Sequence, residues 1–288
     1  MSPPALPKIV WMYWMQGEQH APNVVRHCLG SWRLRNPGWD VRVLDAATCD
    51  AVTDGCLRDL HGRQDLDATH FSDLLRLALL ARHGGVWADA TVFCHRPLDA
   101  WLPACLDSGF FAFASPGPDR ALSSWFLASV PGHLLIRRWQ ASLLHYWEHN
   151  RFRTSVPVPW MRRLEQRYGR NIATTSGWFR WPVRKLLRVT PYFAVHYLFN
   201  RLITEDAACR ASWQRTPCRL ADAPHRLQQL GLLAEASEDL PAWFAVTDTP
   251  VFKLDRRVQD DLPSGCVLAT LYVAAEVTAA YEAHVAGA

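Results

Sequence analysis

The sequence predicts an α/β fold with a Rossmann-type open, mixed sheet and an inserted helical lobe that is basic and aromatic. Three observations predict this class. Short apolar runs alternate with amphipathic stretches over residues 8–93. A glycine pair separates the clearest helix from the strand after it, and a segment rich in arginine, aromatic residues and proline interrupts the pattern after residue 150.

The first elements read as a strand, a helix and a second strand. Residues 8–14 (KIVWMYW) are β-branched and aromatic, which is the composition of a buried strand. Pro22 suits the first turn of a helix, whose apolar positions recur at helical spacing until Asn36-Pro37-Gly38 ends it. Residues 39–43 then alternate between apolar and polar side chains, which predicts a half-buried strand.

The strongest helix signal follows. Asp67 or Thr69 can cap a helix that carries a continuous apolar stripe and ends at Gly84-Gly85. Residues 86–93 (VWADATVF) are then predicted to be the next strand. Because open α/β sheets bind ligands at the carboxyl ends of their strands, residues 89–91 are expected near a ligand-binding rim, together with residues 11–17.

The remaining pattern is less regular. It predicts a helix over residues 47–60, strands over 110–114 and 123–128, a helix over 132–149 and closing strands within 243–254. Residues 151–219 are helical in parts and are broken by Pro157, Pro159, Pro182 and Pro191, so we interpret them as a lobe inserted into one domain. The expected single domain spans residues 1–288, with a core of about 5–150 and 220–288.

The charge of the chain is unevenly distributed. The net charge is +4, but residues 151–219 contain 14 Lys and Arg against three acidic residues, a local charge of +11, which leaves −7 for the remainder. Such polarity indicates that one face meets an anionic partner. A solvated basic surface is the alternative, and charge alone does not separate the two.

The sequence predicts neither export nor a membrane span. Residues 1–8 contain three prolines and one lysine but no apolar core of a signal peptide. The apolar run over residues 121–136 is interrupted by proline, glycine and histidine. Eight cysteines without a CxxC pair favour buried, reduced thiols over a disulfide framework. A cytoplasmic location is therefore expected.

Three charged side chains stand where a ligand could bind. Asp73 and Arg76 share one face of the predicted helix, and Asp89 follows at the end of the predicted strand. A carboxylate and a guanidinium can grip sugar hydroxyls, while another carboxylate positions a divalent cation on a diphosphate. Taken singly, these residues are better explained by a local ion pair on a helix and a helix C-cap.

Together with their neighbours, these residues form a sequence pattern that is more specific for a family than any one of them. The run SDLLRLALLARHGGVWADATVF resembles the core motif of the DXD-containing sugar transferases of glycosyltransferase family 32, and is most similar to the branch of capsular polysaccharide synthesis proteins. The opening PKIVWMYWMQGEQHAP, the later GSW, the segment PYFAVHYLF and the closing VFKL also resemble that branch. The resemblance is specific mainly over residues 7–35 and 70–94.

This resemblance implies a GT-A fold, a nucleotide-sugar donor, a divalent cation (Mn²⁺ or Mg²⁺) and transfer with retention at the anomeric carbon. By position, Asp73 and Arg76 would bind the donor sugar and the diphosphate, and Asp89 would be the first acid of the DXD motif and the metal ligand. These three are the expected catalytic residues. The implied donor-side set is Trp11, Tyr13, Trp14, Ser72, Asp73, Arg76, Asp89, Ala90, Thr91 and Lys253; each aromatic residue fits a core position equally well.

One departure from the family pattern affects the metal. Thr91 replaces the second acid of the DXD motif, and a hydroxyl lacks the charge that a hard cation favours. Lys253 could neutralise a diphosphate, although a surface lysine explains it slightly better. His196 and Tyr192 lie in an aromatic segment on the expected acceptor side, where a buried core histidine is the simpler explanation.

The predicted function is transfer of a sugar from a nucleotide donor, most commonly UDP in such folds, to a hydroxyl of a glycan or a lipid-linked acceptor. The basic, aromatic lobe suggests peripheral binding to an anionic membrane on its inner face. Two alternatives remain open. One is a non-catalytic nucleotide- or carbohydrate-binding protein, which Thr91 permits. The other is a nucleic-acid binder, which leaves Asp73, Arg76 and Asp89 unexplained, so no nucleic-acid partner is predicted.

Overall fold

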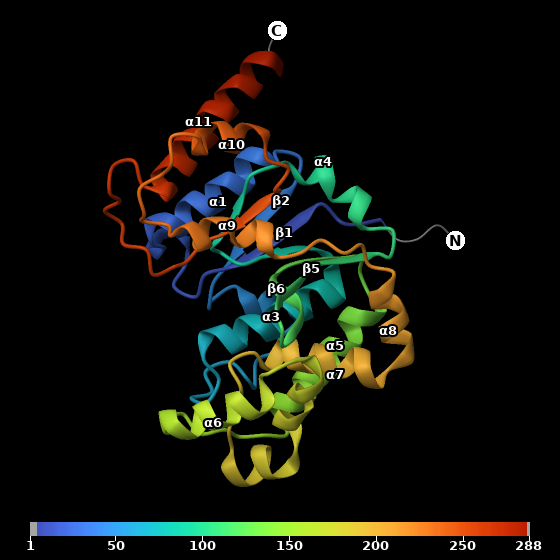
Figure 1. The fold of residues 1–288 in the computed structure, drawn as a ribbon. Coiled ribbons are helices and arrows are strands. Elements are labelled where there is room, and N and C mark those ends of the chain that lie inside the picture. The colour runs from blue at the N-terminus through green and yellow to red at the C-terminus, as the bar shows by residue number, and fades with distance from the viewer. Residues whose placement is uncertain (1–4, 287–288) are drawn as a thin grey trace. The chain divides into compact units, whose positions relative to one another are not determined.

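The computed structural model describes residues 5–286 and has a mixed α/β fold with a central mixed sheet, as the sequence predicts (Figure 1). The chain divides into two compact units. Unit 1 contains Ala46–Trp87 and Cys105–Leu220, with residues 5–7. Unit 2 contains Lys8–Asp45, Ala88–Ala104 and the chain from Ala221 onward. Each unit is therefore assembled from segments that are distant in sequence.

Unit 2 contains a parallel pair of strands. Strands β1 (Ile9–Tyr13) and β2 (Asp40–Leu44) pair in parallel, with Ile9 opposite Asp40 and Tyr13 opposite Leu44. Helix α1 (Asn23–Arg35) connects them and begins directly after Pro22, as predicted. This strand–helix–strand unit confirms the pattern of residues 8–43, because β-branched strands and an amphipathic helix each bury one apolar face.

A second, two-stranded sheet in unit 2 holds β4 (Val92–Cys94) antiparallel to β7 (Val251–Lys253). Helix α1 packs against β4, and the indole Nε1 of Trp32 donates to the carbonyl of Val92 at 2.7 Å. This unit also contains a short 3-10 helix (Glu18–His20) and the α-helices α4 (Leu98–Trp101), α9 (Asp222–Leu230), α10 (Leu240–Val246) and α11 (Val267–Ala286).

Three predicted elements were wrong. Residues 86–93 are not one strand: β3 (Gly85–Ala88) ends before a turn in which Val92 N–H donates to the carbonyl of Asp89 at 2.8 Å. Residues 243–254 contain only the short strand β7, because helix α10 takes up their first part. The helix predicted over 47–60 is limited to α2 (Cys49–Val52), since Asp54 and Gly55 adopt positive φ angles.

Unit 1 is centred on helix α3 (Ala68–His83). Asp67 caps it by accepting from the backbone N–H of His70, and Gly84 ends it with a φ of 67°. A Cβ at Gly84 would lie 2.6 Å from Pro131 Cδ, so both the angle and the space require glycine there. The predicted cap and stop of this helix are thereby confirmed.

The rest of unit 1 surrounds α3. Strands β5 (Phe110–Gly117) and β6 (Arg120–Ser129) form an antiparallel pair that confirms the two predicted strands. Helix α5 (Leu134–Glu148) packs against α3, and α7 (Ala194–Glu205) packs against β6. The remaining elements are α6 (Val158–Tyr168), a 3-10 helix (Ile172–Phe179), a π-helical turn (Pro182–Leu187) and α8 (Ala207–Gln214).

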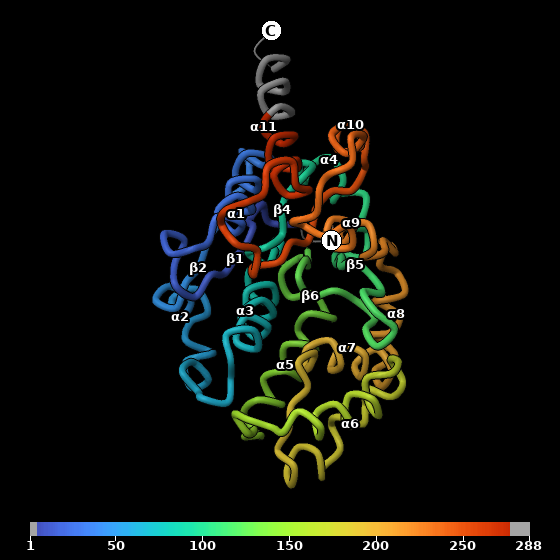
Figure 2. Tube along the Cα trace, turned by 60° about the vertical axis from the view of Figure 1, so that its left-hand side comes forward, coloured from blue at the N-terminus to red at the C-terminus, as the bar shows by residue number. Residues whose placement is uncertain are grey.

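The segment predicted as an inserted lobe is helical throughout most of its length and belongs to unit 1. In both views, α6 and the turn that follows it lie together at one end of that unit (Figures 1 and 2). All eight cysteines are free thiols, and six of them are buried, as predicted. Within residues 5–286, no helix is both long enough and apolar enough to cross a membrane.

Candidate functional site

In unit 1, the predicted Asp73 and Arg76 form a buried ion pair on one face of α3. The Arg76 Nη1 lies 3.0 Å from Asp73 Oδ1, and the two residues are 3% and 4% exposed. The guanidinium also donates to the Ser124 carbonyl at 2.9 Å and to the Ser72 hydroxyl at 3.2 Å. Such a pair is stable in a low-dielectric interior because hydrogen bonds satisfy the charged groups that burial strips of water.

Strand β6 connects this pair to His196. Ser124 accepts from Arg76 with both its carbonyl and its hydroxyl, and its backbone N–H donates to His196 Nε2 at 3.3 Å. The ring of Trp87 lies below the guanidinium, 5.2 Å from its centre. The structure thus brings together Arg76 and His196, which the sequence predicted for opposite sides of the reaction.

A buried histidine that sequence reasoning missed stands beside this cluster. His70 Nδ1 lies 2.9 Å from Asp67 Oδ1, and its Nε2 lies 3.3 Å from the Pro191 carbonyl. Burial opposes protonation, but the hydrogen bond and charge of Asp67, assisted by Asp73, raise the pKa of His70 above its usual value. The sequence signal for His70 was its spacing: it lies three residues after the cap Asp67 and three before Asp73, which places all three on one side of the helix.

Tyr192 lies next to this histidine. Its ring is 6.4 Å from that of His70 in an edge arrangement, and the side chain is 58% exposed. Of the two residues predicted on the acceptor side, Tyr192 therefore lies on the surface, whereas His196 is buried at 9% exposure. Only Tyr192 of the two is freely accessible to a large substrate.

In unit 2, the predicted Asp89, Thr91 and Lys253 form a second polar cluster. The ammonium of Lys253 donates to Asp89 Oδ2 at 3.1 Å and to Thr91 Oγ1 at 2.6 Å. Lys253 stands opposite Val92 in the β4–β7 ladder, and Leu254 N–H donates to the Thr91 carbonyl at 2.8 Å. The strand pairing therefore places the lysine against the acidic turn, and it is not a simple surface lysine.

A family comparison covers the part of the chain that contains both acidic motifs. A model of the family described as "Capsular polysaccharide synthesis protein" matches residues 2–155, which is more than half of the chain and includes Asp73, Arg76 and Asp89. The chain belongs to this family. The family resemblance of the sequence is thereby confirmed.

Curated relatives of the chain are named glycosyltransferases. An O-glycosyltransferase PaGT from Phomopsis amygdali is 28% identical over 158 residues, covering 49% of this chain and 39% of the relative. The glycosyltransferase afumC from Aspergillus fumigatus is 29% identical over 157 residues, covering 48% and 40%. The chain thus spans about two fifths of the length of the curated relatives it matches.

Among solved structures, the chain is similar to the PaToxG glycosyltransferase, with a TM-score of 0.38 and 14% identity. The match covers 69% of this chain and 86% of that one.

The donor set at the acidic turn of this family member does not match a divalent cation. Such a cation takes several charged or carbonyl oxygens, whereas the cluster offers one carboxylate, one hydroxyl and an ammonium bonded to both. A second positive ion beside Asp89 would have to displace the lysine. The expected metal ligand Asp89 is therefore engaged by a cation of the protein's own.

The aromatic residues predicted around a nucleotide base occupy the end of β1. Trp11 is fully buried, with the Arg42 guanidinium 5.2 Å from its ring centre, and Tyr13 is 8% exposed. Trp14 is partly exposed, and its indole Nε1 has no hydrogen-bond partner among the residues that the structure describes. Of the three, Trp14 has the most accessible side chain, but its indole nitrogen is a buried atom. Ala90, in the acidic turn, is 6% exposed.

Proposed function

We propose that the protein is a glycosyltransferase that moves a sugar from a nucleoside diphosphate, UDP in the first instance, to a hydroxyl of an acceptor glycan or lipid. The observation that carries the proposal is that the family match includes two polar motifs, each folded into an organised cluster. The sequence predicts that Asp73 and Arg76 bind the donor; because both are buried and paired with each other, we propose that they fix the geometry of helix α3 and are not the groups that exchange partners with the donor. The Asp89 turn keeps the role of the diphosphate-side motif.

The proposed reaction proceeds with retention and without a protein nucleophile. The bond from the anomeric carbon to the diphosphate breaks, the acceptor oxygen bonds to the same face, and the acceptor's proton passes to the departing phosphate. Asp73 is ill suited to attack, because a carboxylate held by Arg76 and 4% exposed is a poor nucleophile. Catalysis then rests on positioning and on stabilising the leaving group. A sugar covalently trapped on any carboxylate would contradict this mechanism.

Nucleotide binding tests the donor proposal. Thermal unfolding would be followed with UDP, GDP, CMP and ADP, each with and without Mn²⁺, because a ligand that binds only the folded state raises its stability. We expect one nucleotide to raise the melting temperature of the wild type and Asp89→Asn to lose that gain. Asp99→Asn is the matched control, since Asp99 also pairs with a lysine but is exposed.

The same preparations separate the enzyme from a non-catalytic binding protein. Release of free nucleoside diphosphate from a sugar nucleotide, faster with an acceptor present, would support transfer. Nucleotide binding without turnover on any donor would favour the binding protein instead. A melting temperature that no nucleotide changes would contradict both.

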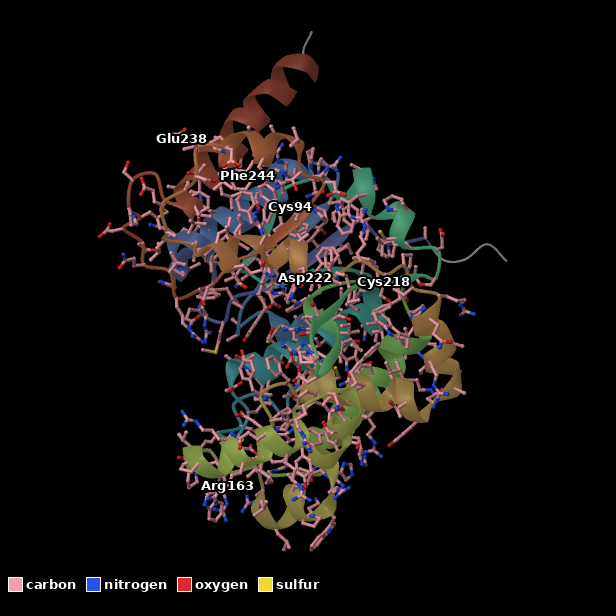
Figure 3. The ribbon with its side chains drawn as sticks, in the orientation of Figure 1. Cys94, Arg163, Cys218, Asp222, Glu238 and Phe244 are labelled. Atoms are coloured by element: carbon pink, nitrogen blue, oxygen red, sulfur yellow. The ribbon has the colours of Figure 1, made fainter. Side chains whose placement is uncertain are left out.

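For the acceptor side, we propose that the end of unit 1 binds an anionic membrane surface and so reaches a lipid-linked glycan. Helix α6 has no buried residue, and Trp160, Trp181 and Leu186 are 52%, 59% and 62% exposed. Exposed arginines accompany them, among them Arg163 on α6 (Figure 3). Aromatic residues beside cations are the composition of an interfacial membrane contact.

Vesicle sedimentation tests this contact. We expect binding to phosphatidylglycerol-containing vesicles at low salt, weaker binding at high salt and none to pure phosphatidylcholine. The double variant Trp160→Ser/Trp181→Ser should sediment less, whereas Val246→Ser, an exposed apolar residue of unit 2, should behave as wild type. Absence of binding at low salt would contradict the proposal.

A further inference from the structure

The acidic turn of unit 2 is organised around a lysine in a way that concerns the chemistry of the leaving group. Lys253 reaches Asp89 and Thr91 from the neighbouring strand, and its side chain is 18% exposed. Because its Cα is fixed opposite Val92 by the antiparallel ladder, the ammonium is placed by backbone pairing. The positive charge at this turn is therefore built into the fold.

The ammonium retains capacity to bind a further anion. It carries three N–H donors, of which the Asp89 carboxylate and the Thr91 hydroxyl take two. The turn also offers few of the oxygens that a hard divalent cation requires, since a threonine stands where the family motif has its second acid. Charge for a diphosphate is thus present, and ligands for a metal are lacking.

We propose that Lys253 supplies the positive charge at the donor's diphosphate and that nucleotide binding by this protein does not require a divalent cation. Asp89 and Thr91 act as positioning residues that orient the ammonium. As the bond between sugar and diphosphate breaks, the negative charge that grows on the leaving phosphate is stabilised by an N–H donor from Lys253, which keeps its proton. This inference rests on the proposed function and deepens it.

Calorimetric titration with inorganic pyrophosphate, UDP and GDP tests the inference. In the wild type, the Kd in EDTA should equal the Kd in Mn²⁺ within about twofold, and Lys253→Met should weaken binding on the order of tenfold or more in both buffers. Lys8→Met is the matched control, because Lys8 also bonds to an aspartate but at an exposed site. Its Kd should equal that of the wild type.

A second variant makes the inference independent of the stability of Lys253→Met. Thr91→Asp/Lys253→Met restores the second acid and removes the ammonium, so it should bind the same ligands only when Mn²⁺ is present. Wild-type binding that disappears in EDTA would overturn the inference and leave the proposed function intact. Failure of every nucleotide to bind in either buffer would remove the proposed function, and this inference with it.

Discussion

Each unit contains an ion pair between two of the predicted site residues, Arg76–Asp73 in unit 1 and Lys253–Asp89 in unit 2, and these two pairs differ in burial much more than in distance. Arg76 and Asp73 are 3.0 Å apart with side chains 4% and 5% exposed. Lys253 and Asp89 are 3.1 Å apart with side chains 18% and 25% exposed. By distance alone, the two ion pairs are equivalent. Exposure indicates that the first pair is fixed by the interior, whereas the second can exchange a partner for a ligand.

Their hydrogen bonds support the same distinction. Arg76 is held from two elements, by Ser72 on its own helix and by Ser124 on β6, and its guanidinium faces the ring of Trp87. Lys253 is bonded to the two polar side chains of one turn. A planar guanidinium with five donors suits a permanent scaffold, while a flexible ammonium suits a contact that changes during binding.

The largest expected effect is that of breaking the buried pair. Arg76→Ala leaves the Asp73 carboxylate buried without its main counterion, which should lower the free energy of unfolding by about 3–5 kcal/mol. Urea unfolding at pH 7 would measure this. Arg82→Ala, which removes an exposed arginine paired with Asp54 on the same unit, should cost less than about 1 kcal/mol.

The companion variant separates charge from packing. Asp73→Asn/Arg76→Met removes both charges and keeps most of the volume, so it should recover a large part of the stability that Arg76→Ala loses. A double variant as unstable as Arg76→Ala would show that packing of the guanidinium on Trp87, and not the buried charge, decides the effect.

The intermediate effect concerns the partly exposed pair of Lys253 and Asp89. Lys253→Met should lower the free energy of unfolding by about 1 kcal/mol or less, because Asp89 keeps access to water when its partner is removed. The same urea experiment measures it beside Arg76→Ala. Equal losses for the two variants would contradict the comparison, since the pairs would then be equally fixed parts of the interior.

The elements of the fold were predictable where the signal is local. The strand at Ile9–Tyr13 and helix α3 follow from side-chain periodicity and from caps within a few residues of the chain. The turn at Asp89 was not, because VWADATVF is apolar enough for a continuous strand. Its interruption depends on pairing of β4 with β7, which lies more than 150 residues later in the chain.

The site shows the same limit. The resemblance identified Asp73, Arg76 and Asp89, and the spacing on α3 implied the first ion pair. The hydrogen bond from Arg76 to Ser124 and the hydrogen bond from Lys253 to Thr91 each join segments that are distant in the sequence. The sequence carries no periodic signal for such contacts. These tertiary contacts turn separate motif residues into clusters.

The smallest expected effect concerns pH: the stability that the Asp67–His70 bond gives to unit 1 should depend on pH. Asp67→Asn keeps an oxygen that can accept from His70 N–H, so the cap of α3 survives while its charge is lost. Burial opposes ionisation, yet His70 lowers the pKa of Asp67 to about 2, and Asp67 raises that of His70. Because the pKa of His70 is raised, its protonation stabilises the fold fully below about pH 6.5, and this stabilisation is lost as the pH rises through the folded-state pKa. Because the pKa of Asp67 is lowered, its ionisation stabilises the fold above about pH 4.

The difference in unfolding free energy between wild type and Asp67→Asn should therefore be largest near pH 5 and shrink at pH 9. Asp67 is 60% exposed, so the difference at pH 5 should not exceed about 1 kcal/mol. Asp206→Asn is the control: Asp206 caps α8 through Ala208 and Cys209 with no histidine bonded to it, and its effect should be the same at pH 5 and pH 9. If both variants show the same pH dependence, the Asp67–His70 bond does not couple protonation to the stability of α3, and the cluster around Asp73 behaves as a fixed scaffold over this pH range.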